Sequence, residues 1–170
     1  MRIYLPATTS VLRTLVDEGR LSGPHTGFAV TPQLREHYAL SDAAADVEEL
    51  EYAALLAAAR ASLRLVDVDP TAARRRVVLA ADVPDTAVDP VDDADTDPGA
   101  VRVTADVPLA DVASAHVDGA EAEDDVRAAV AVVLEADLGS EEAQFLVDQA
   151  EGHELAWYAT QEIGPALDLL

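Results

Sequence analysis

The stretch "GHELAWYATQEIG", residues 152–164, contains residue types that could bind a metal or catalyse hydrolysis. His153 and Glu154 begin as the zinc-protease pattern H-E-x-x-H begins, in which two histidines share one face of a helix. Trp157 stands in place of the second histidine, and the residues after Gly152 are predicted to form a strand. The sequence therefore predicts no metal site here.

Polar residues of several kinds nevertheless surround Trp157, the only tryptophan of the chain. A histidine near carboxylates can act as a general base, so His153, Glu154 and Glu162 are the candidate catalytic residues. The alternative that we favour is a terminal strand whose Trp157 fills the core while its polar neighbours form ordinary hydrogen bonds. Other polar residues that the fold could add to such a site are Tyr4, Arg35, Glu51, Tyr158 and Gln161.

A second set, Ser114, His116 and Asp118, consists of the residue types of a hydrolytic triad. On a strand these residues share one face, with successive members about 6.5 to 7 Å apart. A nucleophile and its base must approach to about 2.6 to 3.2 Å, so this spacing predicts no direct bond between Ser114 and His116. We interpret the three residues as the polar outer face of a half-buried strand.

Arg74, Arg75 and Arg76 form the only basic cluster. Three adjacent guanidinium groups could bind an anionic ligand. Neither G-x-x-x-x-G-K nor G-x-G-x-x-G occurs in the sequence, so no glycine-rich phosphate loop accompanies them. We interpret the arginines as solvated strand-edge residues that offset the local negative charge.

Residues 84–100 are rich in Asp and Pro and contain no basic residue. Such a segment buries too little apolar surface to offset its ordering entropy, which predicts an exposed, mobile loop. Asp93, Asp95 and Asp97 imitate the start of a calcium-binding loop. Pro98 and Thr104 stand where that loop needs Gly and Glu, so the sequence predicts no calcium site.

The composition excludes several classes of function. The chain of 170 residues carries 33 acidic and 11 basic residues, for a formal charge of −22, and this field disfavours nucleic acids and anionic membranes. It does not disfavour a basic protein partner. Cysteine is absent, which removes disulfides and thiolate metal sites, and the N-terminal residues show no secretory signal. We expect a cytoplasmic protein with neither a cofactor nor a membrane span.

Charge repulsion predicts a response to salt. Raising NaCl from about 0.01 M to about 0.15 M shortens the screening length from about 30 to about 8 Å. We therefore expect the melting temperature, followed by circular dichroism, to rise over this range. An unchanged melting temperature would show that self-repulsion does not affect stability.

The elements that must position these residues follow from hydrophobic periodicity and capping. Residues 46–66 form the clearest helix, with an Asp46–Glu49 capping box and an apolar stripe that includes Tyr52 and Leu56. This pattern indicates a central packing helix without a role in chemistry. The fold class predicted is mixed α/β, close to α+β, with residues 1–170 in a single domain. Its mixed sheet has five or six strands, some antiparallel, covered by about five helices.

Six stretches resemble an uncharacterised family of small actinobacterial proteins, a domain of unknown function, over nearly the whole chain. They are "MRIYLPAT", "GFAVTPQLRE", "EELEYAALLAAARASLRLV", "RRVVLAADVP", "VPLADVASAHVDG" and "EGHELAWYATQEI". The resemblance implies a cytoplasmic bacterial origin but no activity, cofactor or catalytic residue.

Two functional hypotheses remain. The first is a non-catalytic binding or regulatory protein with an unidentified protein partner. The second is a small hydrolase that uses His153, Glu154 and Glu162.

Overall fold

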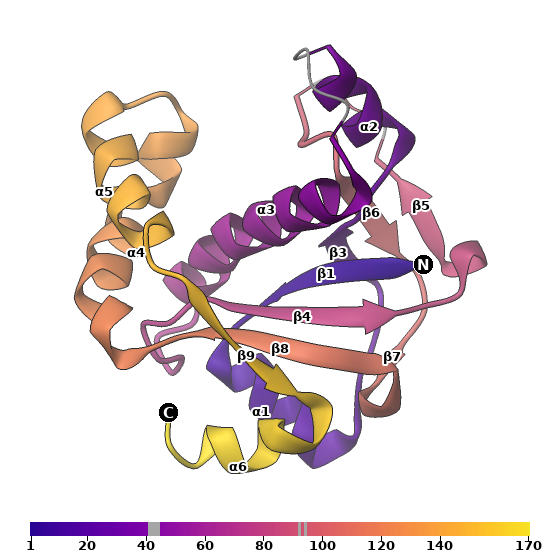
Figure 1. The fold of residues 1–170 in the computed structure, drawn as a ribbon. Helices are drawn as coiled ribbons and strands as arrows, with labels where there is room; N and C mark the ends of the chain where they lie inside the picture. Colours follow the sequence, from indigo (N-terminus) through magenta and orange to yellow (C-terminus); the bar gives the residue numbers. More distant parts are fainter. Residues whose placement is uncertain (41–44, 92, 94) are drawn as a thin grey trace.

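The structure is a computed structural model that describes residues 1–40, 45–91, 93 and 95–170. Its centre is a seven-stranded sheet in the order β5-β6-β3-β1-β4-β8-β9, in which neighbouring strands are antiparallel (Figure 1). The strands are β1 (Arg2–Ala7), β3 (His25–Phe28), β4 (Val77–Asp82), β5 (Val88–Pro90), β6 (Ala100–Val103), β8 (Val112–Asp118) and β9 (Leu155–Ala159). A second sheet pairs β2 (Arg20–Leu21) with β7 (Val107–Pro108).

The mixed α/β class is confirmed, and the predicted numbers of strands and helices are approximate. The main sheet has seven strands where five or six are predicted, and its described pairs are antiparallel where only some were expected to be. Two helices in succession, α4 (Glu123–Asp137) and α5 (Glu141–Glu151), connect β8 to β9. Because the second helix returns the chain to the end of the sheet that it left, β9 pairs antiparallel to β8.

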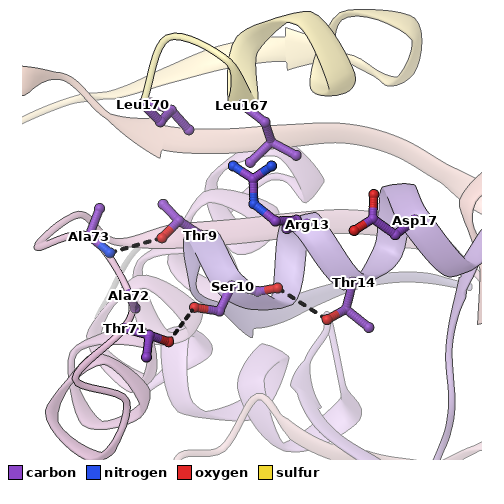
Figure 2. A pocket seen from close by; sticks show the side chains of 10 residues that line it. All are labelled: Thr9, Ser10, Arg13, Thr14, Asp17, Thr71, Ala72, Ala73, Leu167 and Leu170. Carbon is purple, nitrogen blue, oxygen red and sulfur yellow. Dashed lines mark hydrogen bonds between the residues drawn. The ribbon is translucent and has the colours of Figure 1, made fainter.

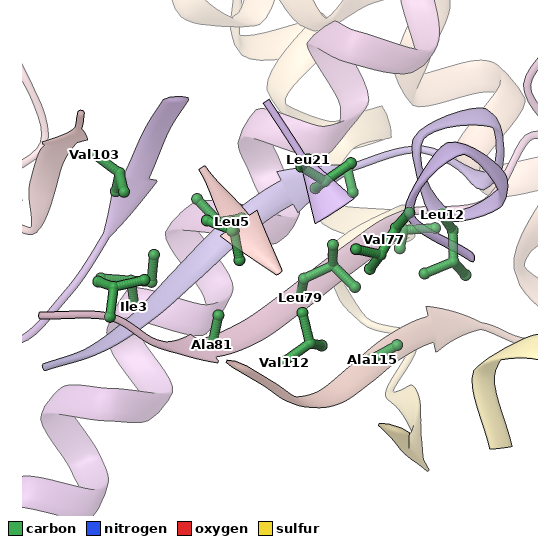
Figure 3. Packing of buried hydrophobic residues seen from close by; sticks show 14 of the residues in the cluster. Ile3, Leu5, Leu12, Leu21, Val77, Leu79, Ala81, Val103, Val112 and Ala115 are labelled. Atoms are coloured by element: carbon green, nitrogen blue, oxygen red, sulfur yellow. The ribbon is translucent and has the colours of Figure 1, made fainter. Parts of the chain in front are cut away.

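One face of the sheet packs against α1 (Thr9–Glu18) and α6 (Ile163–Leu167), which lie together in Figure 1. Alternate residues of the strands supply this core, as Figure 3 shows for Val77, Leu79 and Ala81 of β4. Thr8 caps α1 through its side chain, and Gly19 ends it in the left-handed region with φ of 73°. The alternation of strand residues thus separates this core from the opposite face.

The opposite face packs against α3 (Val47–Val68), which crosses β1, β3 and β4, and against α2 (Pro32–Ala39). Asp46 and Glu49 form the predicted capping box. Ala54 and Ala58 are fully buried, and their small side chains let α3 approach the sheet closely. The helix therefore crosses the middle strands of the sheet, and β8 and β9 lie to one side of it (Figure 1).

The predicted apolar stripe of α3 is wrong in its first half. Tyr52 is 60% exposed and Leu56 is 41% exposed, whereas Leu50 and Ala54 are buried. Two apolar stripes run along this alanine-rich helix, and periodicity alone cannot tell which one meets the sheet. The stripe with the smaller side chains faces the sheet and is buried, and Tyr52 lies on the exposed side of the helix.

The C-terminal half of α3 packs against α4 and α5. Arg64 binds Asp137 through two hydrogen bonds of 2.6 and 2.9 Å, and Arg60 contacts Asp137 and Glu151 at 3.3 Å. Ser140 caps α5 by accepting the backbone N–H of Ala143. The helices α4 and α5, which connect β8 to β9, thus hold the C-terminal half of α3 in place.

The interpretation of Arg76 and Asp118 as solvated residues is wrong. The side chain of Arg76 is 1% exposed and that of Asp118 is 0% exposed. The guanidinium donates to both carboxylate oxygens at 2.8 Å, and the backbone N–H of Arg76 donates to Oδ2 at 2.7 Å. The Arg76 guanidinium also donates to the carbonyl oxygen of His153 at 2.9 Å. This pair joins the start of β4, the end of β8 and the segment that leads into β9.

The other two arginines of the cluster also have protein partners. Arg74 donates to the carbonyl oxygen of Val66 in the last turn of α3, and Arg75 donates to Glu123 at 2.9 Å. Each of the three guanidinium groups therefore already has a protein partner, and that of Arg76 is fully buried with its partner.

Residues 84–100, predicted as one exposed loop, contain the short 3-10 helix η1 (Asp85–Ala87) and the edge strand β5. Ala87 and Val88 are buried, which accounts for the strand that the acidic composition conceals. Residues 92 and 94 lie outside the described residues, and the mobility of the segment stays a prediction. In the described parts of the chain, no helix has the length and apolar character to span a membrane.

Candidate functional site

Three adjoining cavities form a groove between α3 and the β8–β9 end of the sheet. Their volumes are about 380, 340 and 310 Å³, and Tyr52 lines all three. The first and third also share Leu55 and His116. We call this surface the α3–β9 groove; its principal lining residues are Glu51, Tyr52, Leu56, His116, His153 and Trp157.

Trp157 lines the groove and does not fill the core, so our favoured interpretation of this residue is wrong. It is 59% exposed and lies opposite His116 in the β8–β9 register. Neighbouring residues of a strand point to opposite faces, so Tyr158 points away from the groove and packs against the core beside α1. The register of β9 therefore turns the half-buried Tyr158 toward the core and exposes the tryptophan.

Ser114 and His116 form a direct hydrogen bond, which the spacing argument did not predict. The distance from Ser114 Oγ to His116 Nε2 is 3.1 Å. The spacing of about 6.5 to 7 Å separates backbone positions on one face of a strand, whereas an imidazole leans along the strand and spans much of that gap. Ser114 is also buried, so the polar outer face predicted for this strand is wrong for Ser114 and Asp118.

The triad is nevertheless incomplete. The third member, Asp118, binds Arg76 through both carboxylate oxygens. Among the described residues, none forms a hydrogen bond with Nδ1 of His116, so no acceptor orients the ring as a general base. The Ser114–His116 bond therefore has the distance of a catalytic pair without the group that would activate it.

Burial lowers the pKa of His116 below its ordinary value, and the positive charge of Arg2 lowers it further. The ring is accordingly neutral at pH 7 and adds no positive charge to the groove. An unprotonated imidazole can either accept the Ser114 hydroxyl proton or donate its own to the oxygen.

The lowered pKa of His116 predicts a pH effect on stability. As pH falls below about 6.5, the unfolded chain protonates this histidine before the folded chain does, so folding stability decreases until pH passes the folded pKa. We expect His116→Gln to flatten the change in unfolding free energy between about pH 7 and pH 5. Urea denaturation at each pH measures this slope, and an unchanged slope in the variant would contradict the assignment.

The structure brings two of the three candidate catalytic residues into one cavity. His153 and Glu154 line the cavity of about 380 Å³ together with His116. His153 Nε2 lies 2.7 Å from Asp125 Oδ2, at the start of α4. Glu162 lies beyond the other end of β9, where its carboxylate accepts the backbone N–H of Ala159 at 2.8 Å. The catalytic role of these residues stays a prediction.

Two of the additional residues that the sequence suggested do lie in the groove. Tyr4 and Glu51 line the cavity of about 310 Å³ that also contacts Trp157. Burial raises the pKa of Tyr4, and the charge of Glu51 raises it further. Arg2 lines this cavity as well, but Asp82 binds its guanidinium at 2.8 and 2.9 Å. Tyr4 therefore keeps its proton, and the Arg2 charge is already paired.

A larger cavity, of about 600 Å³, lies elsewhere, beside α1 (Figure 2). Its hydroxyl groups are used within the protein. Thr9 Oγ1 accepts the N–H of Ala73 at 2.9 Å, Ser10 Oγ lies 3.3 Å from Thr71 Oγ1, and Thr14 donates to the Ser10 carbonyl. These bonds fasten the loop after α3 to α1, which gives this cavity a structural role.

No cluster of three or more His, Asp or Glu side chains that could hold a metal ion occurs within residues 1–40, 45–91, 93 and 95–170. The two histidines of the groove are bound to Ser114 and Asp125. The groove thus offers aromatic, apolar and carboxylate surfaces as its main binding features.

Comparison with known proteins identifies a family. The model of a family of unknown function, DUF6912, matches residues 1–167. The chain belongs to this family. No curated protein and no solved structure matches the chain. Family membership assigns no activity, so the groove itself is the basis for a functional proposal.

Proposed function

We propose that this DUF6912 protein is a non-catalytic binding or regulatory protein whose partner docks in the α3–β9 groove. The observation that carries the proposal is the exposure of Tyr52, Leu56 and Trp157 along one groove. Large apolar side chains that gather in a concave surface are typical of interaction sites, and tyrosine and tryptophan are the residues that most often dominate binding energy.

The hydrogen bonds of the polar residues support binding over catalysis. Asp118 is held by Arg76, and Glu162 is held by the backbone of Ala159. Groups with such fixed structural partners are poorly placed to exchange protons with a substrate. The net charge of −22 argues for a protein partner over a nucleic acid. The lack of cysteine and lysine and the sequence resemblance support a cytoplasmic location and an actinobacterial origin as further parts of the proposal.

Affinity capture with matched variants tests the proposal. Wild-type protein, a Tyr52→Ala/Trp157→Ala variant and a Phe145→Ala variant are used as baits in extract of the native host. Phe145 is a suitable control because it is 62% exposed on α5 and does not line the groove. We expect at least one protein to be retained by the wild type and the control and lost from the groove variant. Equal retention by all three baits, or no retained protein, would contradict the proposal.

A small hydrolase is the second candidate. Two observations favour it: the 3.1 Å distance between Ser114 and His116, and the presence of His153 and Glu154 in one cavity. A fluorophosphonate probe, which reacts with activated serines, tests the version of the hydrolase in which Ser114 is the nucleophile. Labelling of Ser114 that disappears in a His116→Ala or His153→Ala variant would support the hydrolase. Absence of labelling is the result expected for a binding protein.

A further inference from the structure

We propose that the α3–β9 groove binds an arginine or lysine side chain carried by an extended, basic segment of a partner protein. This inference rests on the proposed binding function and specifies the chemistry of the bound group. Three features of the groove support it: its unpaired carboxylates, its aromatic walls and the sheet edge that borders it.

The groove contains more negative charge than its own arginines neutralise. Glu48 and Glu51 line the cavity that contacts Trp157, and neither forms an ion pair with another described residue. The arginines of the groove are already bound: Arg2 to Asp82, Arg60 to Asp137 and Glu151, and Arg76 to Asp118. The neutral His116 adds no positive charge. A cationic side chain entering here would therefore meet two carboxylates without displacing an internal partner.

The aromatic side chains suit a cation as well. Tyr4, Tyr52 and Trp157 line this same cavity of about 310 Å³. Aromatic faces attract guanidinium and ammonium groups, most strongly in the case of tryptophan. The methylene groups of an arginine or lysine can pack against Leu55 while the charged end reaches the carboxylates. An anionic or purely apolar side chain would use only part of this lining.

The position of β9 favours an extended segment as the carrier. In the part of the chain that the structure describes, β9 is the last strand of the sheet and pairs with β8 on one side only. It contains neither proline nor a charged residue, the usual features that protect an edge strand from pairing. A segment added along this edge would present alternate side chains to the face that carries Trp157. It would thus deliver a side chain beside the groove.

The overall charge distinguishes a basic partner from a second copy of this chain. Two copies, each with a formal charge of −22, repel one another, whereas a basic segment is attracted by the same field. The groove therefore fits a partner of opposite charge better than it fits a copy of the protein.

The intrinsic fluorescence of Trp157 reports on the groove without a label, since the chain has no other tryptophan. The probes are three blocked hexapeptides of alternating threonine with arginine, with leucine or with glutamate. We expect the arginine peptide to change the fluorescence and to bind at least tenfold more tightly than the leucine peptide, with no response to the glutamate peptide. In a Glu48→Gln/Glu51→Gln variant, the affinity for the arginine peptide should fall about tenfold while that for the leucine peptide is unchanged.

Glu36→Gln is the matched control, because Glu36 is exposed on α2 and does not line the groove. It should leave the affinity for the arginine peptide unchanged, which separates local recognition from general attraction to an acidic protein. Circular dichroism verifies that the variants fold. Tighter binding of the leucine peptide, or equal loss of affinity in the control, would overturn the cationic assignment and leave the proposed binding function standing.

Two other outcomes also overturn the inference. No response to any peptide contradicts it, and the capture experiment then decides whether the binding function fails too. A dimer seen by sedimentation that Trp157→Ala abolishes would assign the groove to a second copy of the chain.

Discussion

Asp118→Ala is expected to lower the free energy of unfolding by about 3 to 5 kcal/mol, the usual cost of removing one partner of a buried ion pair. The change leaves the Arg76 guanidinium 1% exposed and without its carboxylate. It also removes the acceptor of the Arg76 backbone N–H. Urea denaturation measures the difference, and a loss below about 1 kcal/mol would show that the pair does not hold this region together.

Two comparisons sharpen this prediction. Asp124→Ala removes the carboxylate of the exposed pair with Arg127, in which Asp124 is 96% exposed, and should change stability little. A double variant, Arg76→Met with Asp118→Leu, replaces both charges with apolar groups and should be more stable than Asp118→Ala, because no buried charge remains unpaired. If Asp118→Ala does not fold, Asp118→Asn, which keeps the shape of the side chain, replaces it in the comparison.

Ser62→Ala is expected to lower the free energy of unfolding by about 2 to 4 kcal/mol, because two backbone groups lose their partner and each costs about 1 to 3 kcal/mol. Ser62 Oγ donates to the Ala7 carbonyl at 2.6 Å and accepts the Val77 N–H at 3.0 Å. The residue is fully buried in the middle of α3, so water cannot replace the hydroxyl. The end of β1, the start of β4 and α3 therefore meet at a single side-chain atom.

Ser10→Ala is the control for Ser62→Ala. Ser10 contacts Thr71 at 3.3 Å and the exposed Asp69, both near the surface, so its loss should change stability by less than about 0.5 kcal/mol. Thermal or urea denaturation compares the two variants. Equal effects at the two positions would contradict the role assigned to Ser62.

Local signals in the sequence predicted the start of α3 correctly. Asp46 and Glu49 form the capping box that the sequence indicated. Capping depends on atoms within three residues of one another, so the sequence contains the whole signal. The polar outer face predicted for the strand fails at Asp118 because a distant arginine binds that carboxylate.

The groove could be predicted only in part. The single tryptophan drew attention to β9, and Tyr4 and Glu51 did join Trp157. The face of β9 that is buried depends on its register against β8, and the exposed stripe of α3 depends on where the sheet ends. Neither is a local property of the chain. One signal for the exposure of Tyr52 and Leu56 was present in the sequence: the same helix has a second apolar stripe with smaller side chains, which could face the sheet instead.

The indole N–H resonance of Trp157 offers the most direct test that the α3–β9 groove is the functional surface. It gives a single, unambiguous cross-peak in the ¹⁵N–¹H spectrum of the labelled protein, because the chain has one tryptophan. As the arginine–threonine peptide is added, binding in the groove should shift this cross-peak progressively until the groove is saturated. If the indole cross-peak stays fixed while resonances around the cavity beside α1 move, the groove is not the binding surface.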